Sequence, residues 1–314
     1  MDNLIFSVNA VLPLFLVMAV GYFFRRKGIF TDEFLGVANH FCFTAALPAL
    51  LFMNAYSSAP SQILNLKLLA LMVGVILGVV ALSCVFVPLA VKDPKKASAI
   101  IQGIYRSNAA LFAMPLTLNI FGQQGLPTIT LLLALAVPLY NVLAVIVLSV
   151  FSGENREGSL KKILNQLLSN RLIWGTFLGL ACSSLSIKLP VAAQSAISSI
   201  GAIATPLAML CIGANFEFKS AAQNLKYTLP TSLLRLLVVP FAATALGAAV
   251  GFRGVELGAL YIIFSAPVAS SSYIMAQSMG SDGKLAGELI VMTTMLSLFT
   301  VFLGVFTLKS LALI

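Results

Sequence analysis

The fold is decided by two apolar stretches, Arg106-Ser-Asn-Ala-Ala-Leu-Phe-Ala-Met-Pro115-Leu and Phe264-Ser-Ala-Pro267-Val-Ala-Ser-Ser-Ser-Tyr-Ile-Met-Ala-Gln277. Each carries a proline and a cluster of small or polar residues where a lipid-facing helix would carry Leu and Ile. Proline removes a backbone donor and clashes with the preceding helical turn. At membrane depth such an interruption is tolerated only where it is buried in protein or lines a cavity. The two stretches therefore predict two broken transmembrane helices.

The composition indicates an all-α polytopic membrane protein. Hydrophobic residues make up 60% and charged residues 9% of the 314 residues, whereas a soluble domain carries about 25% charged residues. The lipid bilayer is therefore the expected solvent, and the first apolar run is too long for a signal-peptide core. The formal net charge of +9 comes without a basic stripe interleaved with aromatics. No nucleic-acid partner is expected for that reason.

Residues that support metal or enzyme chemistry are scarce. The four cysteines lie far apart inside apolar runs, and His40 is the single histidine. Cysteines in such places pack as small hydrophobes. The motifs H-E-x-x-H and G-x-S-x-G do not occur in the sequence, and each would mark a specific chemistry. We predict no metal site, no cofactor and no enzymatic activity.

Ten apolar runs are long enough to span a membrane, for which about 20 residues are needed. The longest connection, residues 152–170, divides the chain into a first half (1–151) and a second half (171–314) with five runs each. Because five is odd, similar halves must have opposite orientations, as in inverted-repeat transporters. The runs cover residues 4–24, 34–56, 67–91, 97–121, 126–151, 171–187, 191–214, 228–250, 255–279 and 285–308.

Lysine and arginine are distributed unevenly over the loops. Thirteen of the 19 lie in loops that follow odd-numbered runs, and four lie on the opposite side. Such a bias marks the cytoplasmic face. We expect a multi-pass protein of the bacterial inner (plasma) membrane, with both termini on the periplasmic side and residues 152–170 in the cytoplasm. Within that loop, residues 159–168 place Leu and Ile on one face, which is typical of an interfacial amphipathic helix.

Five motifs occur along the chain in a fixed order. They are Asn39-His-Phe-Cys-Phe-Thr-Ala-Ala-Leu-Pro48-Ala-Leu-Leu-Phe52; Asn108 with Pro115 ahead of Phe121-Gly122; Tyr140-Asn141; Thr205-Pro206 through Ile212-Gly213-Ala214; and Ala266-Pro267-Val-Ala-Ser-Ser-Ser-Tyr273 with Ala276-Gln277 and Thr293-Thr294-Met-Leu-Ser297. Together they resemble the auxin efflux carrier family, which comprises plant auxin exporters and bacterial relatives that include malonate-type transporters. The resemblance covers nearly the whole chain.

The resemblance implies a secondary carrier of organic anions with ten transmembrane helices in two inverted five-helix repeats. It implies a scaffold of helices 1, 2, 6 and 7 and a transport domain of helices 3–5 and 8–10, with an elevator-type motion. Broken helices 4 and 9 would cross at the substrate site. Dimers occur in the family, so a homodimer is among the expected assemblies. The long hydrophilic central loop of some plant members is missing here, and regulation through it is not expected.

Polar residues at the two breaks are the expected contacts for a carboxylate. Asn108 is expected either to bind the substrate or to satisfy carbonyl groups freed by Pro115. The serines after Pro267 either line the second break or allow close helix packing. Pro115 and Pro267 are expected to shape the crossing, and Pro48 and Pro206 to kink scaffold helices. The candidate substrate-binding residues are Asn108, Asn141, Arg106, Ser270, Ser271, Ser272 and Gln277.

Two arginines fall inside the apolar runs. Arg106 lies about ten residues past Lys96, which is about 15 Å into the span at 1.5 Å per residue. A charge at that depth usually faces a cavity or a partner, so Arg106 is expected to attract or pair with an anion. The alternatives are snorkelling to the cytoplasmic surface or pairing with an acid of another helix. Arg235 lies about eight residues past Tyr227 and is expected to snorkel more easily.

The acidic residues bear on ion coupling. All ten lie in loops or near the ends of runs, so a carboxylate pair for proton antiport is not supported. A sodium site built from carbonyl, Asn and Ser oxygens stays open, and His40 is a candidate protonation site. We predict alternating-access transport of a small carboxylate, either a malonate-like dicarboxylate or an auxin-like monocarboxylate. The alternatives are a sodium- or proton-coupled symporter of the bile-acid-symporter-like type and an anion channel.

Overall fold

The computed structural model describes residues 2–57, 65–151 and 171–314. In this part all regular secondary structure is helical, apart from one isolated β-bridge. The predicted amphipathic helix at residues 159–168 lies outside the described residues.

The helices follow the order of the predicted runs, and several runs consist of more than one helix. Their bounds are α1 (Asp2–Arg26); α2 (Asp32–Phe41), the π-helix η1 (Cys42–Ala46) and α3 (Leu47–Tyr56); α4 (Leu66–Ala90); α5 (Pro94–Tyr105), α6 (Ala109–Phe121) and the short 3₁₀ helix η2 (Gly122–Gly125); α7 (Leu126–Phe151); α9 (Arg171–Ser184); α10 (Val191–Ala202) and α11 (Ala204–Ala214); α12 (Phe218–Leu233), the π-helix η3 (Leu234–Val238) and α13 (Val239–Ala249); α14 (Gly254–Ser265) and α15 (Ser271–Ser278); and α16 (Gly283–Ser310).

Six helical stretches in the described part are long and apolar enough to cross a membrane. On α4 alone, Leu82, Val85 and Phe86 are each about 60% exposed. Contact of such an apolar surface with water is unfavourable, whereas contact with lipid is not. The six stretches are Asp32–Tyr56, Leu66–Ala90, Leu116–Phe151, Val191–Ala214, Ser220–Ala249 and Gly283–Ser310.

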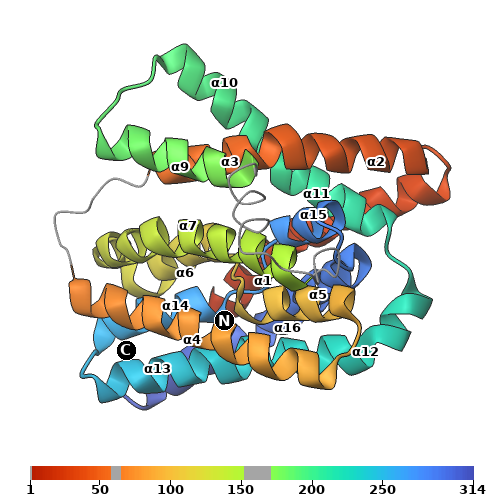
Figure 1. Cartoon of the computed structure of the whole chain (residues 1–314). Coiled ribbons are helices and arrows are strands. Elements are labelled where there is room, and N and C mark those ends of the chain that lie inside the picture. Colours follow the sequence, from red (N-terminus) through yellow and green to blue (C-terminus); the bar gives the residue numbers. More distant parts are fainter. Residues whose placement is uncertain (1, 58–64, 152–170) are drawn as a thin grey trace.

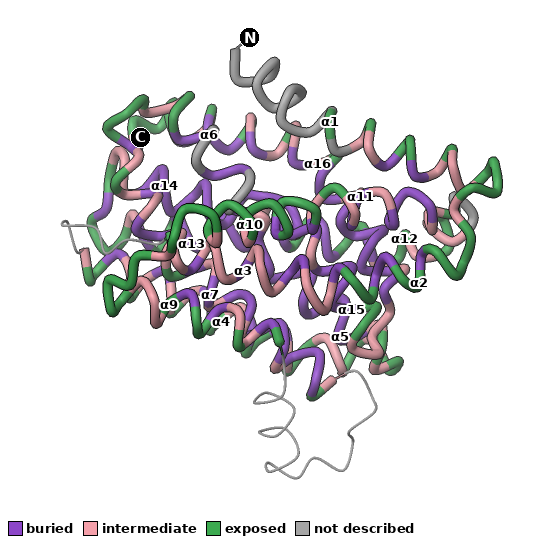
Figure 2. The backbone as a smooth tube through the Cα atoms, turned by 90° about the horizontal axis from the view of Figure 1, so that it is seen from above, coloured by how far each residue is buried: buried purple, intermediate pink, exposed green. Residues whose placement is uncertain are grey.

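The buried side chains form two main cores. The first core joins α4, α5, α6, α7, α13, α14 and α16. The second core joins α1, α2, α3, α9 and α11 and also takes in parts of α7, α15 and α16. In Figure 1, α2, α3, α9 and α10 lie along the top, and α4, α12, α13 and α14 lie below. Figure 2 shows that α10 is mostly exposed and that α14 is mostly buried.

Helix interruptions precede both Pro48 and Pro206. Pro48 follows the π-helix η1, and Pro206 follows the interruption between α10 and α11 at Ile203. A proline inside a helix cannot donate to the carbonyl four residues earlier, which lies at Thr44 for Pro48 and at Ala202 for Pro206. The predicted kinks therefore have matching local causes in the two halves.

Glycines bring α1 and α11 into close contact. A Cβ atom on Gly213 of α11 would overlap the carbonyl oxygen of Met18, and one on Gly21 of α1 would overlap the carbonyl oxygen of Leu210. A corresponding contact joins α9 to α3, where a Cβ on Gly175 would overlap the Pro48 carbonyl oxygen. In both pairs the absence of a side chain lets two backbones approach.

The substitution Gly213→Ala is expected to destabilise the protein by about 1–3 kcal/mol, because the new methyl group forces α1 away from α11. Denaturant-induced unfolding in detergent measures this change. Gly74→Ala on α4 is the matched control, since a Cβ there meets nothing within 4 Å and alanine is the better helix former. Equal stability of the two variants would contradict the close-contact interpretation.

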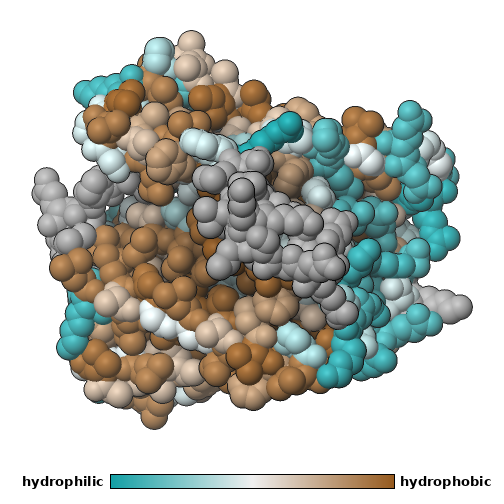
Figure 3. Space-filling view, in the orientation of Figure 1, coloured by the Kyte–Doolittle hydropathy of each residue, from teal (hydrophilic) through white to brown (hydrophobic). Residues whose placement is uncertain are grey.

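Polar loops gather at one end of the molecule, on the right of Figure 3. The backbone N–H of Asp282 donates to the Lys95 carbonyl at 3.2 Å, and Lys284 pairs with Glu217 at 2.7 Å. Hydrogen bonding and the charge of Lys284 lower the pKa of the exposed Glu217 carboxyl, so the pair persists until the pH falls through that lowered value. At the other end, Lys67 donates to the Val250 carbonyl at 3.0 Å.

Candidate functional site

The two broken segments lie against each other. The backbone N–H of Asn108 donates to the Pro267 carbonyl at 2.8 Å, and an antiparallel β-bridge joins Ser107 to Val268. The Ser107 hydroxyl also donates to the Ile263 carbonyl at 2.7 Å. Backbone groups that helices leave unpaired at the interruptions are therefore satisfied between the two breaks.

The two breaks have different local causes. Pro267 disfavours helical geometry at the residue before it, and Ala266 is extended, with φ −64° and ψ 147°. The first break covers residues 106–108, seven residues before Pro115. Pro115 lies inside α6 and does not mark the position of the break, so its role in shaping the crossing stays a prediction. The contacts with the second break stabilise the first one.

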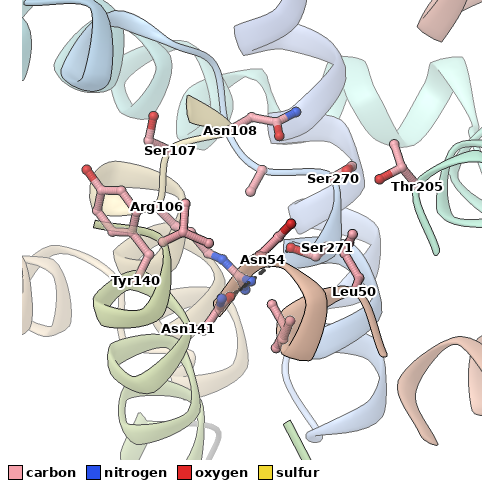
Figure 4. A pocket seen from close by; sticks show the side chains of 13 residues that line it. Leu50, Asn54, Arg106, Ser107, Asn108, Tyr140, Asn141, Thr205, Ser270 and Ser271 are labelled. Atoms are coloured by element: carbon pink, nitrogen blue, oxygen red, sulfur yellow. Dashed lines mark hydrogen bonds between the residues drawn. The ribbon is translucent and has the colours of Figure 1, made fainter. Parts of the chain in front are cut away.

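A cavity of about 210 Å³ opens beside the breaks. The breaks and α7 form one wall, and α3 and α11 form the other. Figure 4 shows Arg106, Asn108, Asn141, Ser270 and Ser271 on one side of this space, and Asn54 and Thr205 on the other. The lining residues are Leu50, Leu51, Asn54, Arg106, Ser107, Asn108, Val137, Tyr140, Asn141, Thr205, Ala269, Ser270 and Ser271.

Arg106 supplies the charge at the cavity wall and is only 2% exposed. Its Nη2 donates to Asn141 Oδ1 at 2.7 Å and to Ser271 Oγ at 2.8 Å, as the dashed lines in Figure 4 show. Its Nη1 contacts the Met275 sulfur at 2.6 Å, and a thioether is a weak acceptor. All three partners are neutral, so they orient the guanidinium without cancelling its charge.

Two helix N-termini add positive potential at the same place. Asn108 is the N-cap residue of α6, and Ser270 is the N-cap residue of α15. Neither side chain makes a capping hydrogen bond, and both residues line the cavity. The first amides of a helix have no partner inside the helix and carry the positive end of its dipole. Such termini bind carboxylate and phosphate groups.

Acidic side chains do not neutralise this region within the described residues. The buried acid of the described part is Glu288, which does not line the cavity and accepts from Ser220 and Asn224. Glu256 accepts from Asn65 at 2.6 Å. Neither Arg106 nor Arg235 forms a salt bridge in the part of the chain that the structure describes. The cavity wall is therefore positively charged and open to an anion.

The structure brings most of the predicted site residues together, but not all of them. Arg106, Asn108, Asn141, Ser270 and Ser271 line the cavity, as the list above shows.

The remaining candidates lie elsewhere. Ser272 is buried behind the cavity, and its hydroxyl has no partner in the described part of the chain. Gln277 lies exposed near the end of α15, beside Gly283. His40 is exposed on α2 and does not line the cavity. No cluster of three or more metal-ligating side chains occurs among the described residues.

Sequence reasoning missed two polar residues on the opposite wall. Asn54 of α3 and Thr205 of α11 both line the cavity. Asn54 interrupts the apolar sequence Leu-Leu-Phe-Met-Asn-Ala-Tyr, which was a usable signal for a residue facing a cavity. Thr205 comes directly before Pro206. The pair is interpreted from the sequence as a helix kink caused by the proline, and Thr205 is not among the candidate site residues.

Comparison with known proteins gives the family. The family model described as "Membrane transport protein" matches residues 6–304. The chain belongs to this family. The resemblance to auxin efflux carriers is thereby confirmed, and the protein is a multi-pass membrane transporter.

Three relatives match this chain over more than nine tenths of both sequences. An uncharacterized transporter of Methanothermobacter thermautotrophicus is 23% identical over 93% of this chain and 95% of its own length. An uncharacterized transporter of Methanocaldococcus jannaschii is 23% identical over 94% and 96%. A protein of Rhizobium meliloti with the name "Putative malonate transporter" is 24% identical over 93% and 92%.

Proposed function

We propose that this transporter is a secondary carrier of small organic anions, and that it binds a carboxylate in the cavity beside the two breaks. The observation that carries the proposal is Arg106, a buried guanidinium at the cavity wall with three neutral partners. An unpaired charge at membrane depth is costly. An anionic ligand that pairs with the guanidinium offsets this free-energy cost, because attraction between opposite charges is strong away from water.

The size of the cavity favours a small substrate. Pockets for drug-sized ligands measure about 300–1,000 Å³, and this cavity measures about 210 Å³. A malonate-like dicarboxylate fits this volume better than an auxin-like molecule with an indole ring. The name of the Rhizobium meliloti relative, "Putative malonate transporter", points to the same class of substrate, a small dicarboxylate.

Each proposed site residue has a distinct role. Arg106 pairs with the carboxylate, and Asn141 and Ser271 hold the guanidinium in place. Asn108 and Ser270 offer their side chains and the amides at the starts of α6 and α15. This division follows the general rule that a few well-placed polar groups orient a ligand while the remaining surface encloses it.

We propose ten spans in two inverted five-helix repeats, residues 1–151 and 171–314. The close pairs α1–α11 and α9–α3 support this arrangement, because each joins the first run of one half to the second run of the other. The first core fits a transport domain, and the second core fits a scaffold that packs on α7, α15 and α16 of that domain. The cavity lies between the breaks on one side and α3 and α11 on the other. An elevator motion would carry the anion with the breaks past the opposing wall.

The proposed setting is the inner membrane of a bacterial cell, with both termini periplasmic and residues 152–170 cytoplasmic. The distribution of lysine and arginine supports this orientation. The family resemblance implies that homodimers can form, and a homodimer therefore stays a prediction for this protein.

A ligand screen tests the function. Purified protein is heated with and without malonate, other small dicarboxylates and monocarboxylates, each in sodium-containing and sodium-free buffer. A ligand that binds the folded state raises the unfolding temperature. Tracer uptake into liposomes then separates carrier from channel. Saturation and counterflow are expected for a carrier, and flux that shows neither would overturn the proposal in favour of a channel.

The substitution Asn108→Ala is expected to weaken carboxylate binding about 10- to 100-fold, since a hydrogen bond to a charged group contributes about 1.5–3 kcal/mol. Isothermal titration with the best ligand of the screen measures the loss. Asn119→Ala is the matched control, because Asn119 is exposed on the same helix. Wild-type affinity in Asn108→Ala would remove this residue from the site.

A further inference from the structure

Arg235 is a second fully buried guanidinium, and the carboxylate site does not use it. It lies in the π-helix η3, is 0% exposed and does not line the cavity. The sequence-based expectation that it snorkels to the surface is therefore wrong. Its Nη2 donates to the Ala266 carbonyl at 2.8 Å. Its Nε and Nη1 have no hydrogen-bond partner among residues 2–57, 65–151 and 171–314.

The π-helix explains how Arg235 reaches the interior. Pro240 cannot donate to the Leu236 carbonyl, and the backbone N–H of Val239 instead bonds to the Leu234 carbonyl, five residues back. This wider turn shifts the following residues around the helix axis. Leu234 and Val238 remain exposed, whereas Arg235 is buried, and η3 packs against α5, α14 and α16.

Arg235 places its positive charge at the carbonyl end of α14. Ala266 is the C-cap residue of α14, and the carbonyl end of a helix carries negative partial charge. Arg106 is likewise the C-cap residue of α5, at the first break. The carbonyl end of α14 therefore has the buried guanidinium of Arg235, whereas Arg106 ends α5 and directs its own guanidinium to Asn141 and Ser271. The helices that begin after the breaks direct their amide ends to the cavity.

The protein's own donors already satisfy the carbonyl groups of residues 262, 263, 266 and 267, at the end of α14 and just after it. The hydroxyl of Ser265 donates to the Ile262 carbonyl. The Ser107 hydroxyl donates to the Ile263 carbonyl, and the Asn108 backbone amide donates to the Pro267 carbonyl. Hard cations in proteins need several free oxygen ligands, and a transporter's coupling ion typically takes them from such carbonyl ends.

We propose that Arg235 is a built-in cation that occupies, at the second break, the place a coupling cation would take. Anion transport then needs no alkali cation, because the positive charge at the carbonyl end of α14 is permanent. Arg235 acts as a positioning residue that keeps the break in its binding geometry. This inference rests on the proposed anion carrier and extends it to ion coupling.

The first test uses thermal unfolding of the full-length protein, which does not depend on the substrate. At equal ionic strength, wild-type protein is expected to unfold at the same temperature in sodium, potassium or N-methylglucamine chloride. Arg235→Gln is expected to unfold at a lower temperature, because the positive charge that compensates the carbonyl end of α14 is lost; sodium or potassium is expected to raise that temperature. Arg253→Gln is the matched control, since Arg253 also donates to backbone carbonyls but is exposed. Stabilisation of wild-type protein by sodium would overturn the inference.

The second test measures malonate uptake into liposomes under an imposed membrane potential. Wild-type protein and Arg235→Lys are expected to show equal rates, within twofold, with and without sodium. Arg235→Gln is expected to lose at least tenfold in sodium-free buffer and to recover part of the rate with sodium. Uptake by wild-type protein that strictly requires sodium would overturn this inference and leave the anion carrier standing. A lack of saturable carboxylate uptake in every variant would instead overturn the proposed function.

Discussion

The substitution Arg106→Gln is expected to weaken carboxylate binding by about 30-fold or more. Removing one partner of a buried, hydrogen-bonded charge pair costs about 2–5 kcal/mol. Arg106 is the charged residue at the cavity wall, and its three hydrogen-bond partners are neutral. Glutamine therefore leaves only dipoles to hold the anion. Isothermal titration with the strongest carboxylate of the screen measures the change. Affinity within threefold of wild type would refute the role of the guanidinium.

Stability should change in the opposite direction. An unpaired buried charge destabilises the protein without ligand, so Arg106→Gln is expected to unfold at the same or a higher temperature than wild type in the absence of carboxylate. This combination distinguishes loss of a binding group from misfolding. Arg26→Gln is the matched control, because Arg26 is exposed and bonds to Tyr22 at the end of α1. It should change neither binding nor stability by more than a small amount.

The two breaks show how far local sequence determines the fold. Pro267 lies in the second break because proline restricts the residue before it, an effect that is readable from the sequence. The first break lies at residues 106–108 and not at Pro115. Its position depends on hydrogen bonds to a segment about 160 residues away. Such pairing is a tertiary effect, and one sequence contains no local signal for it.

The site residues show a similar limit. Arg106 and Asn141 were predictable because charge and amide groups are rare in apolar runs. The separation of Ser271 from Ser272 was not predictable, because it depends on where α15 begins and how it is rotated. The burial of Arg235 depends on a π-turn that shifts one helix face, and helical periodicity alone predicts a regular turn instead.

The substitution Asn141→Asp is expected to abolish carboxylate binding, with a loss of about 100-fold or more. It places a carboxylate where the amide oxygen now lies, 2.7 Å from Arg106 Nη2. The protein would then carry its own anion in a charge-assisted bond with the guanidinium. An incoming carboxylate would meet a neutralised cation and a like charge. The aspartate variant should also unfold at a higher temperature than wild type, because the buried charge gains a partner.

The matched control is Asn141→Leu, which removes the amide and adds no charge. It is expected to reduce affinity about tenfold, since Arg106 keeps its charge and its bond to Ser271 at 2.8 Å but loses one orienting partner. Titration of both variants with the same carboxylate separates the two effects. If leucine and aspartate weaken binding equally, Asn141 acts only by holding Arg106 in place. If aspartate alone abolishes binding and raises the unfolding temperature, the charge of Arg106 is what holds the transported anion.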